Sequence, residues 1–201
     1  RAAGEGAVIA RSVTGIVLAG GMGRRMGGVD KGLVPLAGRP MVEHVLTRLR
    51  PQVDDVLINA NQNLDRYAEF GCPVVPDRVG GFAGPLAGLD AGLHATDAAL
   101  VVTVPCDSPF LPHDLVTRLA TARSATDADV AVARTGNQPH PVFALVCARV
   151  RSHLADFLAR GERKIDLWYA SLNVVEVAFD DEADAFANIN TRAELDQHDH
   201  R

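Results

Sequence analysis

Short apolar runs alternate along the chain with longer segments whose apolar residues recur at helical spacing. The short runs predict strands, and the periodic segments predict amphipathic helices. Strands are expected at 14–18, 55–60, 73–75, 99–104, 130–134, 141–146 and 172–179, and helices at 41–49, 64–70, 86–94, 112–123 and 150–160. This order predicts a three-layer α/β fold in which helices cover both faces of a mostly parallel central sheet.

Proline and glycine clusters fall between neighbouring elements, and the sequence contains neither an internal repeat nor a long linker. Because 201 residues suit one large domain, we expect residues 14–201 to form a single domain. Residues 1–13 lack the basic start and compact apolar stretch of a signal peptide. We expect them to be a disordered leader.

Composition and charge narrow the functional classes. The net charge of −5 argues against a protein that neutralises a nucleic-acid backbone. Apolar runs are much shorter than the roughly 18 residues that a membrane-spanning helix needs, so we expect no membrane contact. Cys72, Cys106 and Cys147 are widely spaced and cannot all pair with one another. That pattern suits a reducing compartment, and the cytoplasm is the expected location.

The loop after the first expected strand is rich in glycine and positive charge. Its glycines let backbone N–H groups approach an anion without a Cβ in the way. The residues concerned are Gly20, Gly21, Gly23, Arg24, Arg25 and Lys31. Lysine is otherwise rare, since 18 of the 20 basic residues are arginine. The loop predicts a phosphate cradle, although the P-loop and dinucleotide-binding spacings are absent; a flexible turn with solvated arginines is the alternative.

Asp107 directly follows the most apolar strand and lies between two prolines. Magnesium is commonly held by one or two carboxylates together with substrate phosphates, so Asp107 is a candidate metal ligand. A turn-capping aspartate is the alternative, as it is for Asp77 at the end of another strand. The amides of Asn59 and Asn61 could read a base edge or cap a loop.

Other residues are less informative on their own. His140 could face a ligand phosphate or be an exposed bystander. Asn188 and Asn190 lie just before a threonine that could cap a helix. Cys106 is read as a small core residue, because no base is near it in the sequence. The sequence shows neither zinc-ligand spacing nor a serine nucleophile elbow.

Taken together, these segments resemble the signature of the nucleotidyltransferases that build molybdenum cofactors, most closely the molybdenum cofactor guanylyltransferase family. Residues 18–32 read Leu-Ala-Gly-Gly-Met-Gly-Arg-Arg-Met-Gly-Gly-Val-Asp-Lys-Gly. Further matching segments are 35–40, 59–61, Asp77, 84–88, 105–109, 140–141 and 188–191. The resemblance covers essentially everything after Thr14. The Gly-Gly after Ala19 favours the guanylyl branch, since cytidylyl relatives more often read Ala-Ala-Gly there.

The resemblance implies a Rossmann-like nucleotidyltransferase fold and a magnesium-dependent reaction. The enzyme would transfer GMP from GTP to the terminal phosphate of molybdenum-molybdopterin, releasing pyrophosphate and forming the molybdopterin guanine dinucleotide cofactor. The implied catalytic residues are Arg24, Lys31 and Asp107, with Asp107 also the magnesium ligand. The implied nucleotide-binding residues are Leu18, Ala19, Gly20, Gly21, Lys31, Asn59, Asp77 and Asp107. Gly84, Gly88, His140, Asn188 and Asn190 match positions on the pterin side of the cleft.

Three other functions remain open from the sequence. The chain could be a molybdopterin cytidylyltransferase or a sugar-phosphate nucleotidyltransferase that uses a similar loop. It could also be a non-catalytic module that binds nucleotide and delivers cofactor. The presence of both Lys31 and Asp107 argues against the last of these. Molybdoenzyme apoproteins or delivery chaperones are the expected protein partners.

Overall fold

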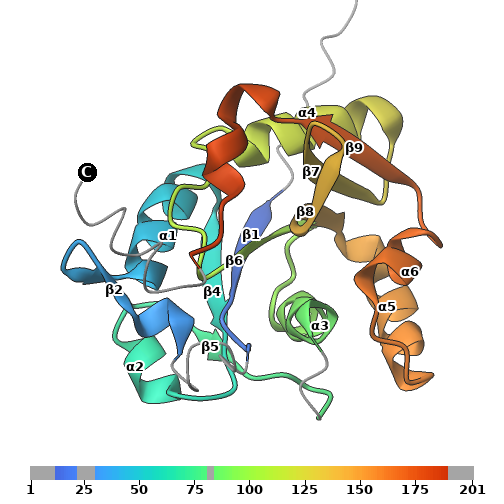
Figure 1. Cartoon of the computed structure of the whole chain (residues 1–201). Helices are drawn as coiled ribbons and strands as arrows, with labels where there is room; N and C mark the ends of the chain where they lie inside the picture. The colour runs from blue at the N-terminus through green and yellow to red at the C-terminus, as the bar shows by residue number, and fades with distance from the viewer. Residues whose placement is uncertain (1–11, 22–29, 81–83, 190–201) are drawn as a thin grey trace, which may run out of the picture.

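A computed structural model describes residues 12–21, 30–80 and 84–189 (Figure 1). A seven-stranded sheet has the order β5-β4-β1-β6-β8-β7-β9, and β2 and β3 form a separate ribbon. The strands are β1 Val13–Leu18, β2 Pro35–Leu36, β3 Arg39–Pro40, β4 Asp55–Asn59, β5 Val74–Val75, β6 Leu100–Pro105, β7 Val130–Thr135, β8 Gln138–Cys147 and β9 Val174–Ala178. The α-helices are α1 Met41–Leu49, α2 Leu64–Ala68, α3 Pro85–Ala95, α4 Leu115–Thr126, α5 Arg151–Ala159 and α6 Ile165–Tyr169. The 3-10 turns are η2 Lys31–Leu33, η3 Arg50–Gln52, η4 Ala148–Val150 and η5 Asp180–Phe186.

All described strands of the main sheet except β8 run in the same direction. β8 is antiparallel because it forms a hairpin with β7, in whose turn Gly136 adopts a left-handed conformation with φ of 54°. The carboxyl ends of β1, β4, β5 and β6 therefore meet at one edge of the sheet. The mostly parallel α/β sheet predicted from the sequence is confirmed.

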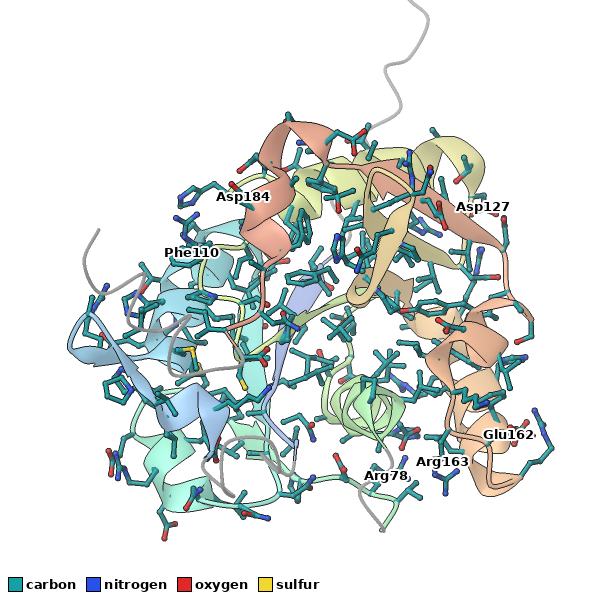
Figure 2. The ribbon with its side chains drawn as sticks, in the orientation of Figure 1. Arg78, Phe110, Asp127, Glu162, Arg163 and Asp184 are labelled. Carbon is teal, nitrogen blue, oxygen red and sulfur yellow. The ribbon has the colours of Figure 1, made fainter. Side chains whose placement is uncertain are left out.

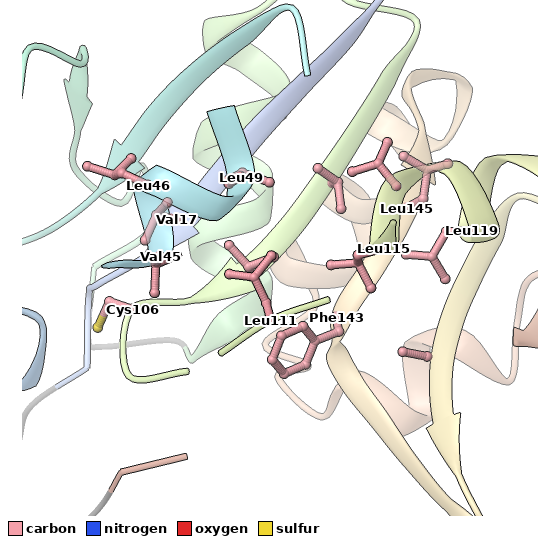
Figure 3. Packing of buried hydrophobic residues seen from close by; sticks show 14 of the residues in the cluster. Val17, Val45, Leu46, Leu49, Cys106, Leu111, Leu115, Leu119, Phe143 and Leu145 are labelled. Atoms are coloured by element: carbon pink, nitrogen blue, oxygen red, sulfur yellow. The ribbon is translucent and has the colours of Figure 1, made fainter. Parts of the chain in front are cut away.

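Helices cover both faces of this sheet (Figure 1). α1, α2 and α4 contribute to one buried apolar cluster, and α3, α5 and α6 contribute to the other. In the first cluster Val45 and Leu49 of α1 are buried together with Val17 of β1 (Figure 3). Each such side chain stabilises the fold by about 1.5–3 kcal/mol when it is removed from water. The loops at the carboxyl edge thus start from a rigid base.

The predicted elements lie within three residues of their expected ends. α4 begins at Leu115 rather than at 112, and β8 begins at Gln138 rather than at 141, so the turn between β7 and β8 is shorter than the gap between the two expected strands. The β2–β3 ribbon, α6 and the 3-10 turns were not predicted. Each is too short or too polar to show a repeating apolar pattern.

The amino-terminal boundary needs a correction. Val13 was expected to end the leader, but it is the first residue of β1 and pairs with Leu100. Its N–H also donates to Asp54 Oδ2 at 2.8 Å, which extends the ordered strand by one residue. Residues 1–11 lie outside the described residues. Among the described helices, none has the length and apolar character needed to span a membrane.

Two glycines on α3 bring this helix close to the sheet. A Cβ on Gly92 would lie 1.9 Å from Ile16 Cδ1, and Ile16 is fully buried. One turn earlier, a Cβ on Gly88 would lie 2.6 Å from Leu18 Cδ2. Because both distances are below any real non-bonded carbon–carbon contact, a side chain at either position would have to displace Ile16 or Leu18.

We predict that Gly92→Ala destabilises the fold by about 1–3 kcal/mol, because the added methyl group overpacks a filled core. Urea denaturation measures the change. The double variant Gly92→Ala/Ile16→Val removes the Cδ1 atom that the new methyl would meet and should recover part of the loss. Equal stability of Gly92→Ala and the wild type would contradict the close packing.

Candidate active site

A cavity of about 320 Å³ opens at the edge where β1, β4, β5 and β6 end. Ligands of open α/β sheets bind beyond the carboxyl ends of the strands, so this is the expected place for a site. The cavity is lined by Leu18, Gly20, Gly21, Asn59, Asp77, Gly84, Pro85, Pro105 and Val142. Six of these residues were singled out from the sequence, which means that the structure brings residues from four separate segments together.

A second, wider concavity of about 670 Å³ lies beside η5. Its lining includes four acidic residues together with Arg48 and Phe110, and Figure 2 labels Phe110 and Asp184. The acidic residues are Asp180, Asp181, Glu182 and Asp184. Their charge would repel a polyphosphate, so the smaller cavity is the candidate nucleotide site.

Two asparagines hold the carboxylate of Asp77 from both sides. Asn59 is 2% exposed, and its Nδ2 donates to Asp77 Oδ1 at 2.9 Å and to the carbonyl of Val75 at 3.1 Å. Asn61 Nδ2 donates to Asp77 Oδ2 at 2.9 Å, and the N–H of Asp77 donates to Asn61 Oδ1 at 2.8 Å. Each carboxylate oxygen has accepted one hydrogen bond from these amides and can accept another. The carboxylate is therefore held in one orientation and can still accept hydrogen bonds from a ligand.

The glycines after β1 leave room next to this group. A Cβ on Gly20 would lie 2.9 Å from Asn61 Nδ2 and 3.1 Å from Asn59 Oδ1, whereas a Cβ on Gly21 would meet nothing within 4 Å. Ala19, which is buried, donates its N–H to the carbonyl of Asn59 at 2.8 Å. Gly20 thus permits close packing of the loop, while Gly21 leaves open space at the cavity wall.

Lys31 and Asp107 form an ion pair beyond the end of β6. The Nζ of Lys31 lies 3.1 Å from Asp107 Oδ2, with the two side chains 21% and 11% exposed. Asp107 follows Cys106, whose N–H donates to the carbonyl of Leu18 at 3.1 Å and ties this loop to the end of β1. Because the pair is mostly shielded from solvent, salt screens it less than a surface pair.

Cys106 does not supply a nucleophile to this site. Burial raises the pKa of its thiol well above the ordinary range, and the nearby charge of Asp107 raises it further. The thiol is therefore protonated at neutral pH, in agreement with the interpretation of Cys106 as a core residue. Figure 3 shows Cys106 at the edge of the buried cluster near Val45.

The chain after η5 returns to the Asp107 loop. Ser108 Oγ donates to Asn188 Oδ1 at 2.5 Å, and the N–H of Ile189 donates to the carbonyl of Asp107 at 2.9 Å. Asn188, which the family resemblance assigned to the pterin side, therefore lies against the loop that carries the candidate metal ligand. Asn190 and Arg24 lie outside the described residues.

His140 is on β8 and contacts other parts of the protein rather than standing alone in a turn. Its ring stacks on Phe186 of η5 at 4.7 Å, and its Nε2 lies 2.7 Å from Thr135 Oγ1. Burial lowers the pKa of the imidazole, so the ring is neutral at pH 7. These contacts place His140 as a support for the segment that leads to Asn188.

Gly84 and Gly88 differ in what they contribute. Gly84 precedes α3 with a φ of 73°, a conformation that favours glycine, and lines the cavity. The positive end of the α3 dipole therefore points toward the cavity. Gly88 packs instead beneath the site, where a Cβ would lie 2.3 Å from Asn59 Oδ1.

Sequence reasoning left some site residues undecided or unnamed. Asn61 was undecided, although its spacing of two from Asn59 would place both amides on one side of an extended segment. Val142 was missed because it reaches the cavity from β8, the only described strand of the main sheet with reversed direction. Tyr67 and Asn63, which contact the segment just before Lys31, carry no sequence signal of that role.

The fold and the site define a Rossmann-like α/β protein with a ligand cavity at the carboxyl edge of its sheet. Gly20, Gly21 and the amide-held carboxylate of Asp77 line this cavity, and the pair of Lys31 and Asp107, which is not part of the lining, lies beyond the end of β6. Residues 15–173 match the family described as the MobA-like NTP transferase domain. The chain belongs to this family.

Relatives and solved structures agree with this assignment. The chain is 51% identical over 185 residues to a molybdenum cofactor guanylyltransferase of Shewanella putrefaciens, covering 92% of this chain and 95% of the relative. It is 54% identical over 192 residues to the protein of that name from Cupriavidus metallidurans, covering 93% and 94%. The fold is similar to that of molybdopterin-guanine dinucleotide biosynthesis protein A from Archaeoglobus fulgidus, with 26% identity, a TM-score of 0.77, and coverage of 93% and 97%.

We predict that Gly88→Ala weakens nucleotide binding about tenfold or more, because the new methyl group displaces Asn59 and removes a donor from Asp77. Titration of the nucleotide by calorimetry measures the effect. Gly92→Ala/Ile16→Val is the matched control, since it adds the same methyl group one turn further along α3. Tight nucleotide binding by Gly88→Ala would contradict the dependence of the site on Asn59.

Proposed function

We propose that the chain transfers GMP from GTP to the terminal phosphate of molybdenum-molybdopterin. An oxygen of that phosphate attacks the α-phosphorus of GTP, the bond between the α-phosphorus and the bridging oxygen breaks, and pyrophosphate leaves. The product is the molybdopterin guanine dinucleotide cofactor. The names of the relatives support this reaction, and so does the joining of two polar clusters at one edge of the sheet.

The proposal that the base is guanine rests on the carboxylate of Asp77, which the amides of Asn59 and Asn61 hold in place. Guanine presents two neighbouring donors, N1–H and N2–H, which match the two carboxylate oxygens. Cytosine presents one amino donor next to acceptor atoms, and a carboxylate would repel those acceptors. Asn59 and Asn61 fix the carboxylate at the cavity wall, so the match to guanine needs no rearrangement.

The proposed phosphate end of the site combines three sources of positive charge or N–H donors. These are the N–H groups of Gly20 and Gly21 after β1, the amino-terminal end of α3 beyond Gly84, and the ammonium group of Lys31. As the bond to pyrophosphate breaks, negative charge grows on the leaving group, and Lys31 is the described cation best placed to stabilise it. We assign Arg24 the same role from the family resemblance alone.

The donor set around Asp107 fits Mg²⁺ bound together with nucleotide. Within the described residues there is no group of three or more histidine, cysteine, aspartate or glutamate side chains that could hold a metal alone. Magnesium does not need such a group, because it is usually bound by one or two carboxylates plus substrate phosphates. Asp107 would supply the carboxylate. When bound, the ion would neutralise charge on the phosphate oxygens.

No side chain needs to act as the nucleophile in this reaction. The attacking phosphate is already an anion near neutral pH, so the protein's task is to place two polyanions and balance their charge. The raised pKa of the Cys106 thiol agrees with a site that uses no thiol nucleophile.

We further propose that the protein acts in the cytoplasm, where free thiols such as Cys72, Cys106 and Cys147 persist. We also propose that it passes its product to molybdoenzyme apoproteins or delivery chaperones.

GTP with Mg²⁺ should raise the melting temperature more than ATP, CTP or UTP, because a ligand that binds only the folded state stabilises it. Differential scanning fluorimetry with each nucleotide, with and without Mg²⁺, measures the shifts.

Asp77→Asn should reduce the preference for GTP over CTP about tenfold or more, since one acceptor becomes a donor. Asp65→Asn, the same charge change at an exposed position, is the control.

Each other outcome points to a different function. A shift selective for CTP would identify a cytidylyltransferase, and pyrophosphate release with a sugar phosphate in place of the pterin would identify a sugar-phosphate nucleotidyltransferase. Nucleotide binding without pyrophosphate release in the presence of molybdenum-molybdopterin would identify a delivery module. No shift with any nucleotide would contradict the proposal.

Asp107→Asn should remove most turnover while leaving the fold intact, because it keeps the shape of the side chain and loses the negative charge. We expect about 100-fold slower pyrophosphate release, a loss typical of removing one group that stabilises transition-state charge. Rates are measured across a Mg²⁺ titration, with circular dichroism as the check on folding. Near-normal turnover at saturating Mg²⁺ would contradict the metal assignment.

A further inference from the structure

Asp30, the residue before Lys31, is held by two donors from the α2 region. Tyr67 Oη donates to Asp30 Oδ1 at 2.5 Å, and Asn63 Nδ2 donates to Asp30 Oδ2 at 3.0 Å. Tyr67 is on α2, and Asn63 is the residue just before that helix. Both carboxylate oxygens are therefore engaged, and the backbone that leads into Lys31 has a fixed attachment to another element.

Tyr67 is part of the hydrophobic core. Its side chain is fully buried, in the same cluster as Val17, Val45 and Cys106. Burial raises the pKa of the phenol, and the neighbouring Cys106 and Asp30 raise it further, so the hydroxyl keeps its proton and acts as a donor. The carboxylate of Asp30 is thus attached to a residue of the protein core.

The same hydroxyl also lies beneath the turn that carries Lys31. A Cβ on Gly32 would lie 2.5 Å from Tyr67 Oη and 3.2 Å from Cys106 Cβ. The turn is closed by the N–H of Leu33, which donates to the carbonyl of Asp30 at 3.1 Å, and by the N–H of Val34, which donates to that of Lys31 at 3.2 Å. Asp30 therefore begins a short turn that rests directly on Tyr67.

We propose that Asp30 and Tyr67 are positioning residues that hold the turn Lys31–Leu33 so that the ammonium group of Lys31 meets Asp107. Lysine has a long side chain with four rotatable bonds, so its charge is well placed only if its backbone is fixed. The hydrogen bond between Tyr67 and Asp30 fixes it from below. The catalytic part of this inference rests on the proposed function, because that function gives Lys31 its role at the phosphates.

The alternative is that Tyr67 and Asp30 only stabilise the fold. A stabilising pair would lower the melting temperature when broken but leave the rate and the state of Lys31 unchanged. A positioning pair would lower kcat, because small displacements of a charge from the reacting atoms reduce the rate strongly. The two roles can therefore be separated by measuring stability, kinetics and the Lys31 side chain in the same variants.

The test uses Tyr67→Phe, which keeps the ring and removes the hydroxyl. We expect kcat to fall about 10- to 100-fold, with a smaller change in KM for GTP. Thr14→Val is the matched control, since it also removes one buried hydroxyl, bonded to Thr96 Oγ1 at 2.9 Å, at the opposite end of β1. The control should lose stability but keep the wild-type kcat.

A second readout needs neither nucleotide nor pterin. The chain contains two lysines, Lys31 and Lys164, so protein labelled with ¹³C-lysine gives two sets of Hε–Cε signals by NMR. A held side chain shows two distinct Hε resonances, whereas an exposed side chain such as Lys164 averages them. We expect the Lys31 signals to merge in Tyr67→Phe and to stay distinct in Thr14→Val. Lys31→Arg assigns the signals.

Two substitutions of Asp30 separate the contribution of its hydrogen bond to Tyr67 from the contribution of its negative charge. Asp30→Asn keeps an oxygen that can accept from Tyr67, so it should retain more activity than Asp30→Ala. Distinct Lys31 signals in Tyr67→Phe, together with a kcat equal to that of Thr14→Val, would overturn the inference. If the Lys31 signals merge in Tyr67→Phe but the wild-type protein does not turn over GTP, the positioning role is supported and the proposed function is refuted.

Discussion

α3 rests directly on β1 and β4 because Gly88 and Gly92 carry no side chain on the face toward the sheet. This contact encloses the carboxamide of Asn59 between helix and strand, where it must find hydrogen-bond partners within the protein. The partners it finds are the carbonyl of Val75 and the carboxylate of Asp77. The direction of the carboxylate at the cavity wall is thus a consequence of core packing and not of loop conformation alone.

The other charged cluster is supported from the opposite face of the sheet. Tyr67 belongs to the apolar cluster that also contains α1 and α4, whereas α3 belongs to the cluster on the far side. The Asp77 carboxylate at the proposed base end is therefore supported through the middle of α3, and Lys31 at the proposed phosphate end through α2, while the amino-terminal end of α3 faces the cavity. α3 packs on β1, β4, β5 and β6, whereas α2 packs on the edge strand β5, so the two clusters depend on separate helices.

The sequence predicts the layers and the edge of the sheet well, because these depend on long apolar repeats and on where strands end. It locates Gly20, Asn59, Asp77 and Asp107 for the same reason, as each follows or ends an apolar strand. It does not predict the contact of Tyr67 with Asp30, which joins residues 37 positions apart, or the approach of Val142 from an antiparallel strand. Such contacts depend on the order of strands in space, which local pattern does not contain.

Lys31 and Asp107 neutralise each other in the structure, so neither buried charge stands alone. A magnesium triphosphate carries both an anion for the lysine and a cation for the aspartate. Its arrival would let the two existing pairs exchange partners, so that the lysine and the aspartate would each keep an opposite charge beside them. The protein would then avoid the energetic cost of an unpaired, partly buried charge before its substrate binds, and again after pyrophosphate departs with its metal.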